Sequence, residues 1–175
     1  MHEFVSSNQV AVVVPSSLRH FANDLPKHWM ICEVPDGENQ KDGQVLLSLL
    51  NKLADSGFTR DCWIVGLGGG ATTDLAGFVA ATYLRGVKWI AVPTSMAAMV
   101  DAAIGGKTGI NLKAGKNLAG SFYSSRAVFV DINFLNTLSD RDLVAGMAEV
   151  VKCGFISDTK FSICAAGVGE LICRS

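Results

Sequence analysis

Acidic and basic side chains lie within two apolar stretches of the sequence. Asp101 lies within residues 96–104, and Glu149 and Lys152 lie three positions apart within residues 145–152. A carboxylate in such a run must be paired, hydrogen-bonded or placed at the edge of a cleft. Glu149 is therefore a candidate metal ligand or acid–base group. The plainer alternatives are a solvent-facing Asp101 on a half-buried helix and an ordinary surface ion pair of Glu149 with Lys152.

Two further lysines lie in glycine-rich segments. Lys107 belongs to residues 105–109, and Lys116 is followed directly by Asn117 within residues 115–117. A lysine in a flexible loop is usually only solvated. Beside a phosphate-binding element, however, two of them can bind an anionic substrate. These segments therefore predict an anionic ligand if such an element lies close by.

Three consecutive glycines, residues 68–70, are a candidate for that element. An apolar run at 62–67 precedes them, and apolar residues recur at helical spacing between positions 75 and 83. Glycines permit positive φ and let backbone N–H groups approach a ligand closely, and a helix N-terminus attracts anions. Thr72 or Thr73 can cap this helix. The stretch is a candidate pyrophosphate cradle, although a strand–helix turn without a ligand has the same pattern, and it is neither G-x-G-x-x-G nor a P-loop.

The elements that must position these residues alternate along the chain. Helices are expected at 18–25, over the apolar face of residues 46–53 with an end near 56–57, and directly after the glycines. Strands alternating with helices predict a Rossmann-like parallel sheet with helices on both faces, and ligands bind such sheets beyond the carboxyl ends of the strands. The glycines, Thr94 with Ser95, and the turn at 35–41 all follow strand ends, so we expect them at one crevice. The predicted strands are residues 9–14, 29–34, 62–67, 88–92 and 127–131.

From Leu138 onward the pattern is helical. Ser139 and Asp142 resemble a capping box, and a second helical stretch begins near Asp158. We therefore predict a Rossmann-like α/β domain over residues 1–137. Residues 138–175 are expected to begin a second, all-helical domain.

Composition excludes several classes of protein. The 175 residues are 49% hydrophobic and carry a net charge of −1, which gives no reason to expect a nucleic-acid or membrane partner. No apolar run reaches the ~18 residues of a membrane span. The five cysteines form no C-x-x-C pair. They favour a reducing, cytoplasmic location.

Several motifs resemble the 3-dehydroquinate synthase family. The resemblance is carried by residues 68–86 and extends over about residues 11–158. The glycine run alone would not separate this family from glycerol and iron-dependent alcohol dehydrogenases, which share its general fold. The other matching motifs keep the family's order and spacing at residues 92–95, 100–101, 105–109, 115–117, 134–137 and 146–152.

The resemblance implies a phosphate-eliminating lyase of the shikimate pathway, which leads to aromatic amino acids. Its substrate would be the phosphorylated sugar acid 3-deoxy-D-arabino-heptulosonate 7-phosphate, and its products 3-dehydroquinate and phosphate. The resemblance also implies NAD, which is used and regenerated within one turnover, and zinc or cobalt to hold the substrate hydroxyls.

The resemblance assigns roles residue by residue. Cofactor-binding residues would be Asp36, Glu38 and Lys41 on the adenosine side, Gly69, Gly70, Ala71, Thr72, Thr73 and Asp74 at the pyrophosphate, and Thr94, Ser95, Lys107, Lys116, Phe134, Leu135, Asn136 and Thr137 along the crevice. Substrate-binding and catalytic residues would be Asp101, Lys107, Lys116, Asn117, Lys152 and Arg85, the last reaching the neighbouring subunit's substrate in a homodimer. Glu149 would be the metal ligand.

The family's chains are longer, and they take further histidine metal ligands from a helical domain. We therefore expect a truncated chain with an incomplete metal site, inactive alone unless a C-terminal polypeptide complements it, because catalytic zinc normally takes three protein ligands. A related sugar-phosphate cyclase, a polyol dehydrogenase and a non-catalytic NAD-binding remnant remain alternatives. Without covering partners, an apolar patch would favour association at Leu143, Met147, Val150, Val151, Phe155 and Phe161.

Overall fold

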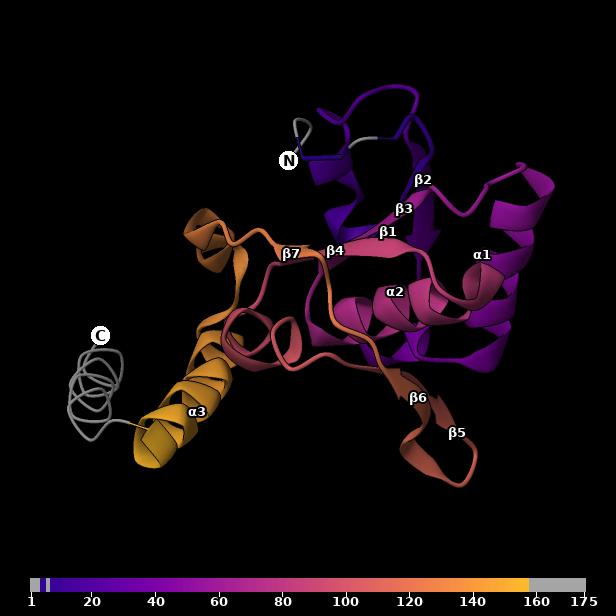
Figure 1. Cartoon of the computed structure of the whole chain (residues 1–175). Coiled ribbons are helices and arrows are strands. Elements are labelled where there is room, and N and C mark those ends of the chain that lie inside the picture. Colours follow the sequence, from indigo (N-terminus) through magenta and orange to yellow (C-terminus); the bar gives the residue numbers. More distant parts are fainter. Residues whose placement is uncertain (1–3, 6, 158–175) are drawn as a thin grey trace.

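A five-stranded parallel sheet forms the centre of the computed structural model, which describes residues 4–5 and 7–157. The strand order is β2–β1–β3–β4–β7, and all four pairings are parallel (Figure 1). This confirms the predicted α/β fold. The strands are β1 (Val10–Pro15), β2 (Met30–Val34), β3 (Trp63–Gly68), β4 (Lys88–Pro93) and β7 (Ala127–Val128).

Alternate residues of the central strands enter two separate cores. Ala11 and Val13 of β1 face α1 (Gly43–Asp55) and α2 (Gly70–Thr82), which both cover one face of the sheet. Val10, Val12 and Val14 face the other side, where the 3₁₀ helices η1 (Ser16–Ala22) and η5 (Ile132–Thr137) contribute Leu18, Phe21 and Phe134. Every residue of β1 and β3 is buried, as expected for parallel strands covered on both faces.

Two predicted elements are shorter or differ in type. The helix expected at 18–25 is the 3₁₀ helix η1, and the strand expected at 127–131 pairs only at Ala127 and Val128. Asp131 caps η5 by accepting a hydrogen bond from the Asn133 N–H, so the chain leaves β7 soon after Val128 to begin this helix.

The glycine-rich segments predicted as loops are instead an antiparallel hairpin. β5 (Lys107–Leu112) pairs with β6 (Gly115–Phe122) below the main sheet in Figure 1. A Cβ at Gly120 would lie 2.2 Å from the Thr108 carbonyl oxygen, and one at Gly109 would lie 2.6 Å from that of Ala119. The prediction was wrong because glycine usually disfavours strands, whereas here it permits the close approach of two backbones.

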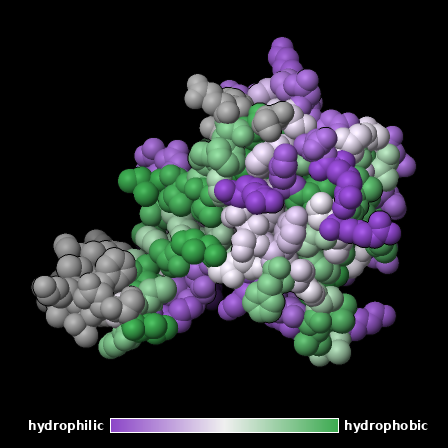
Figure 2. Space-filling model, in the orientation of Figure 1, coloured by the Kyte–Doolittle hydropathy of each residue, from purple (hydrophilic) through white to green (hydrophobic). Residues whose placement is uncertain are grey.

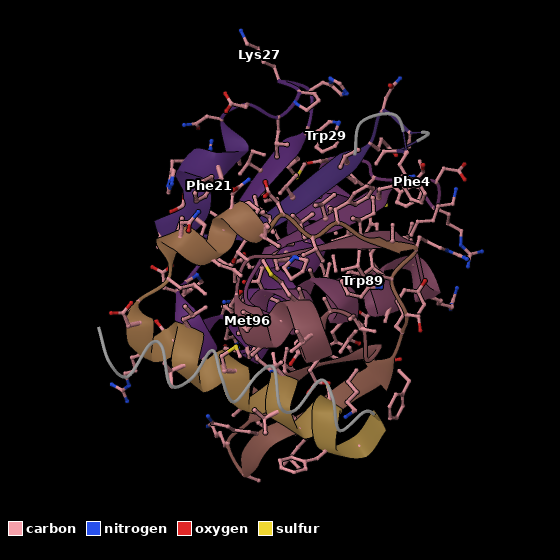
Figure 3. All side chains as sticks on the ribbon, turned by 90° about the vertical axis from the view of Figure 1, so that its left-hand side faces the viewer. Phe4, Phe21, Lys27, Trp29, Trp89 and Met96 are labelled. Carbon is pink, nitrogen blue, oxygen red and sulfur yellow. The ribbon has the colours of Figure 1, made fainter. Side chains whose placement is uncertain are left out.

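Helix α3 (Asp140–Ser157) extends away from the sheet and confirms the helix expected after Ser139. Ser139 Oγ accepts from the Asp142 N–H at 3.2 Å and donates to the Asp142 carboxylate at 2.7 Å, as in the predicted capping box. A Cβ at Gly146 would lie 2.5 Å from Met96 Cβ, so this glycine allows α3 to dock beside Met96 (Figure 3). The boundary between residues 1–137 and 138–175 stays a prediction, and the second helical stretch lies outside the described residues.

The apolar surface expected on α3 is only partly present. Val150 is buried and Leu143, Met147 and Val151 are half-buried, whereas Phe155 is 76% exposed. Figure 2 shows apolar residues gathered over η5 and α3. Phe161 lies outside the described part of the chain. No helix within that part is long and apolar enough to cross a bilayer.

Candidate active site

A crevice of about 750 Å³ opens where the parallel strands end. Its lining includes Ser17 after β1, Asp36, Gly37, Glu38 and Gln40 after β2, the glycine turn after β3, and Thr94 and Ser95 after β4. The predicted convergence of these segments is therefore present. The predicted cofactor-binding residues that line this nucleotide crevice are Asp36, Glu38, Gly69, Gly70, Ala71, Thr72, Thr94, Ser95 and Thr137.

The glycines of this turn are needed because neighbouring atoms approach their backbone closely, and not because they adopt a positive φ. Gly69 is the N-cap residue of α2, with extended φ −73° and ψ −171°. A Cβ at Gly68 would lie 2.3 Å from Thr72 Oγ1. Neither Thr72 nor Thr73 caps the helix, which corrects our expectation: both lie inside α2, and Thr73 Oγ1 donates to the Gly70 carbonyl at 3.0 Å. Because the N–H groups of Thr72 and Thr73 donate to the Gly69 carbonyl, those of Gly70 and Ala71 are the ones left for a ligand.

Buried polar atoms of two uncharged side chains that line this crevice lack a hydrogen-bond partner. They are Thr72 Oγ1 and Gln40 Oε1, on side chains that are 0% and 2% exposed. A hydroxyl beside a helix N-terminus can donate to a phosphate oxygen, and an amide oxygen can accept from a nucleoside hydroxyl or amine. Unpaired buried polar groups are rare. The residues present therefore fit a dinucleotide such as NAD.

Ser17 was not predicted, yet it fixes a predicted residue. Its backbone N–H and its hydroxyl both donate to Asp36 Oδ1, at 3.0 and 2.6 Å. These hydrogen bonds hold the pKa of Asp36 below its usual range. Asp36 therefore stays ionised and can accept from ligand hydroxyls. In the sequence, the only indication of a role for Ser17 is its position just after the end of β1.

Lys41 lies beneath the crevice rather than in its lining. Its side chain is 4% exposed, and its ammonium donates to Asp74 Oδ2 at 2.5 Å and to Asn117 Oδ1. Burial raises the pKa of Asp74, and the contact with Lys41 opposes that rise. Lys41 thus joins α2 to β6, and direct contact with a cofactor stays a prediction.

Replacing Lys41 with methionine should lower the free energy of unfolding by about 2 kcal/mol at pH 7, because Asp74 and Asn117 lose their shared donor. The pKa of Asp74 is raised in the folded state, so this loss should shrink as the pH falls through that value and the carboxylate is protonated. Urea unfolding at pH 7 and pH 5 measures both effects. Lys27→Met, at an exposed lysine labelled in Figure 3, is the control and should change little.

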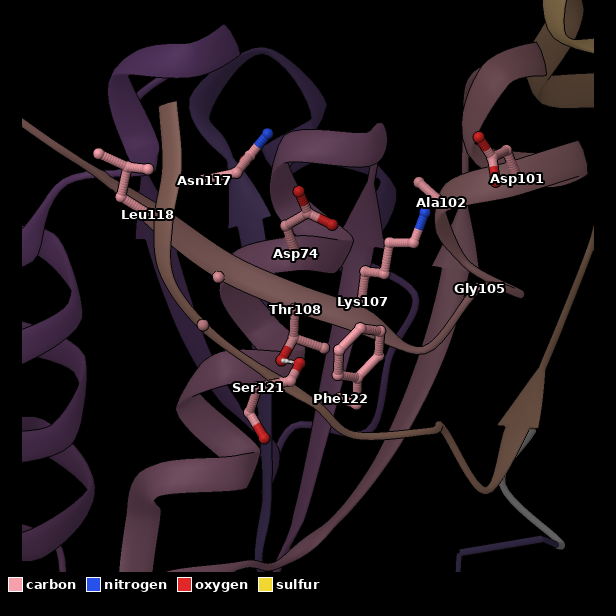
Figure 4. A pocket seen from close by; sticks show the side chains of 12 residues that line it. Asp74, Asp101, Ala102, Gly105, Lys107, Thr108, Asn117, Leu118, Ser121 and Phe122 are labelled. Carbon is pink, nitrogen blue, oxygen red and sulfur yellow. Dashed lines mark hydrogen bonds between the residues drawn. The ribbon is translucent and has the colours of Figure 1, made fainter. Parts of the chain in front are cut away.

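A second cleft of about 470 Å³ lies between α2, the hairpin and the short π-helix η4 (Ala98–Ala102). Figure 4 shows Asp74, Lys107 and Phe122 around it. Phe122 is 84% exposed, and Thr108 Oγ1 donates to the Ser121 carbonyl at 2.8 Å in its wall. This substrate cleft brings together three predicted substrate residues, Asp101, Lys107 and Asn117.

Lys152 connects the two cavities. It lies 3.0 Å from Asp101 Oδ2, which lines the substrate cleft, and also contacts Glu149, which lines the nucleotide crevice. The hydrogen bond from Lys152 lowers the pKa of Asp101, and the two carboxylates raise the pKa of Lys152. A π-helix such as the one that carries Asp101 is frequent at functional sites. Glu149 and Lys152 do form the ion pair of the plainer alternative, but the pair is not isolated, because Lys152 also contacts Asp101.

This ion-pair cluster should make the docking of α3 depend on pH. The pKa of Asp101 is lowered in the folded state. Its contribution to the stability of α3 docking is therefore present above about pH 3.9 and is lost as the pH falls through the lowered pKa. The pKa of Lys152 is raised in the folded state. Its contribution to the stability of α3 docking is therefore present below about pH 10.4 and is lost only as the pH rises through the raised pKa. Amide hydrogen exchange in α3 should accelerate, relative to α1, between pH 5 and pH 3. If amide exchange in α3 of Asp101→Asn accelerated equally over the same pH range, protonation of Asp101 would not be the cause.

The described residues do not by themselves form a metal site. Within that part of the chain, no three His, Cys, Asp or Glu side chains gather closely enough to hold an ion. Glu149 contacts Lys152 instead. A metal-binding role of Glu149 stays a prediction.

Several predicted residues line neither cavity. Arg85 is exposed at the opposite end of α2, with φ 65°, and Lys116 is exposed on β6. Phe134 packs edge-on against Phe21 with ring centroids 5.1 Å apart, so it supports the crevice from the core. Direct ligand contact by these residues, and by Thr73, Leu135 and Asn136, stays a prediction.

Known proteins resemble the chain in both sequence and fold. A 3-dehydroquinate synthase of Cutibacterium acnes is 49% identical over 159 residues, which cover 88% of this chain and 43% of that relative. The chain thus spans less than half of that relative's length. The structure of 2-deoxy-scyllo-inosose synthase complexed with carbaglucose-6-phosphate, NAD+ and Co2+ has 34% identity and a TM-score of 0.76, covering 83% of this chain and 42% of that one.

A second solved structure is ValA, the 2-epi-5-epi-valiolone synthase of Streptomyces hygroscopicus subsp. jinggangensis 5008, with NAD+ and Zn2+ bound. Its identity is 28% and its TM-score 0.80, covering 87% of this chain and 45% of that one. Residues 31–145, which contain the glycine turn, the hairpin and most of the crevice lining, match the family described as 3-dehydroquinate synthase N-terminal. The chain belongs to the 3-dehydroquinate synthase N-terminal family.

Proposed function

We propose that the chain is the NAD-binding part of a 3-dehydroquinate synthase, which converts 3-deoxy-D-arabino-heptulosonate 7-phosphate to 3-dehydroquinate and phosphate. The observation that carries the proposal is the nucleotide crevice, where the glycine turn meets the buried, unpaired polar atoms of Thr72 and Gln40. Membership of the synthase family supports the substrate.

In this proposal the residues of the crevice orient the cofactor. The first N–H groups of α2 and the Thr72 hydroxyl bind the pyrophosphate, while Asp36 and Glu38 accept hydrogen bonds from ribose hydroxyls. Gln40 accepts from the adenosine side. NAD, when bound, would accept a hydride from the carbon that bears a substrate hydroxyl, while the hydroxyl itself loses a proton.

The substrate cleft would hold the phosphorylated sugar acid. Lys107 can attract its negative charge, and Asn117 can hydrogen-bond to it. Asp101 stays ionised beside Lys152 and can accept hydrogen bonds from substrate hydroxyls. Lys116, and Arg85 from a second copy in a homodimer, are proposed as further cationic contacts.

A metal ion is part of the proposal only through Glu149. The structures of two related cyclases contain Co2+ or Zn2+, which supports one bound divalent ion in the whole enzyme. Because the described residues offer no set of three ligands, Glu149 would contribute one ligand of a shared site.

Calorimetric titration of the chain with NAD tests the proposal. We expect binding in the micromolar to millimolar range, followed by tighter binding of 3-deoxy-D-arabino-heptulosonate 7-phosphate than of glycerol in a panel of substrates. A preference for glycerol or another unphosphorylated polyol would favour a dehydrogenase. Absence of NAD binding would overturn the proposal.

A further inference from the structure

We propose that Asn111 is a positioning residue of the nucleotide crevice, which acts by holding the Glu38 carboxylate in place for the nucleotide. Asn111 lies on β5 and lines neither the crevice nor the substrate cleft. The inference rests on the proposed NAD-binding function, because the ligand that Glu38 meets in the crevice is the nucleotide.

The Asn111 side chain uses both ends of its amide. Nδ2 donates to Glu38 Oε1 at 2.7 Å, across 73 positions of the sequence. Oδ1 accepts from the backbone N–H of Asn117 at 2.8 Å. Its own backbone N–H donates to the Lys41 carbonyl oxygen at 2.8 Å. Asn111 therefore joins the turn after β2 to both strands of the hairpin.

These contacts close into a ring. Lys41 donates through Nζ to the Asn117 side chain, Asn117 donates through its N–H to Asn111, and Asn111 donates through its N–H back to Lys41. Asn117 has φ 57°, a left-handed conformation uncommon for a residue other than glycine. Asp74 anchors the ring to α2 through its contact with Lys41. The hydrogen bond to Glu38 is thus made by a fixed group rather than by a mobile side chain.

Glu38 needs such a fixed partner. It lies on η2 (Gly37–Gln40), a four-residue 3₁₀ helix, and its side chain is exposed at the crevice. An exposed glutamate loses rotamer freedom when it binds a ligand. Asn111 occupies one carboxylate oxygen, which restricts the rotamers of Glu38 and leaves the other oxygen for a ribose hydroxyl. Preorganisation of this kind increases affinity by lowering the entropy lost on binding.

A double-mutant cycle on NAD affinity tests the inference, using calorimetric titration of the whole chain. Asn111→Ala should weaken NAD binding about fivefold, in keeping with the entropy lost when one rotamer-rich side chain is immobilised on binding. Glu38→Ala should also weaken it. In the Glu38→Ala background, Asn111→Ala should change the affinity less than about twofold, because its effect passes through Glu38. Asn51→Ala, at an exposed asparagine on α1, is the control and should leave NAD affinity unchanged.

Folding is checked separately from binding. The backbone bond from Asn111 to Lys41 survives in Asn111→Ala, whereas the Asn117 amide loses its acceptor and should exchange faster without any ligand. If Asn111→Ala lowers the thermal midpoint below that of Asn51→Ala, Asn111→Ser takes its place in the cycle.

The outcomes separate this inference from the proposed function. If NAD binds and Glu38→Ala weakens it, but the two substitutions are additive or Asn111→Ala has no effect, Asn111 does not act through Glu38 and only the inference fails. If Glu38→Ala leaves the affinity unchanged, the inference fails together with the assigned role of Glu38. If the wild-type chain binds no NAD, both the proposed function and the inference are overturned.

Discussion

Gly69→Asp is expected to weaken NAD binding by at least about 100-fold, while the thermal midpoint stays at or above that of the wild-type chain. Aspartate is a preferred N-cap residue, and its carboxylate would accept hydrogen bonds from the first N–H groups of α2. It would therefore occupy the anion site from within the chain and repel the pyrophosphate. The backbone at Gly69, with φ −73°, accepts a side chain, and a Cβ there would lie 3.3 Å from Ser95 Oγ, a tight contact that a small shift of this hydroxyl relieves.

The matched control is Gly43→Asp. Gly43 is the first residue of α1, and a Cβ there would meet only Ile110 Cδ1, at 3.9 Å. This variant adds the same charge at another helix N-terminus, at a residue that does not line the crevice, and should bind NAD as the wild-type chain does. Calorimetric titration of the two variants side by side gives the comparison. Equal affinities would mean that the start of α2 does not bind the pyrophosphate.

Gly77→Val should lower the free energy of unfolding by about 3 kcal/mol, the upper range for overpacking a core. Gly77 lies in α2, where a Cβ would lie 2.4 Å from Thr108 Cγ2 and 3.0 Å from Trp89 Cζ2. Neither neighbour can move easily. Thr108 Oγ1 donates to the Ser121 carbonyl at 2.8 Å, and Trp89 Nε1 donates to the Tyr123 carbonyl at 3.1 Å. Urea unfolding followed by circular dichroism measures the loss.

A second substitution tests the cause of that loss. Thr108→Ser removes Cγ2 and keeps the hydroxyl, so Gly77→Val should cost clearly less in this background. Ala81→Val places valine on the same helix at a half-buried position and should cost well under 1 kcal/mol. An equal loss from Gly77→Val with and without Thr108→Ser would show that contact with β5 is not responsible.

The sequence predicts the sheet and the place of the crevice because both depend on local patterns. Buried parallel strands require continuous apolar runs, such as residues 62–67, and their carboxyl ends meet at one edge. The hairpin escaped prediction because Gly109 and Gly120 resemble loop residues until their strands are brought together. The Thr72 and Thr73 caps were wrong because the glycine before them already forms the N-cap, which places both threonines inside the helix.

Other features of the site depend on contacts between distant positions. Nothing near Asn111 in the sequence indicates that it bonds to Glu38, since the two are 73 positions apart. Gln40 resembles any polar turn residue until burial leaves its amide oxygen without a partner. The roles of Asp101, Lys107 and Asn117 were open on residue pattern alone, and it is the folded cleft that brings them together.

The order of the strands also affects how the chain emerges during synthesis. β1 lies between β2 and β3, and the pairing of Val10 with Trp63 closes a loop that contains both β2 and α1. Parallel pairings between distant segments form slowly, because loop-closure entropy is lost before the contacts compensate for it. A nascent chain that has been extended only through α1 therefore has one edge of its valine-rich first strand without a partner. That edge stays open to other chains until Trp63 to Gly68 leave the ribosome, so the nascent chain is exposed to wrong strand pairing during this interval.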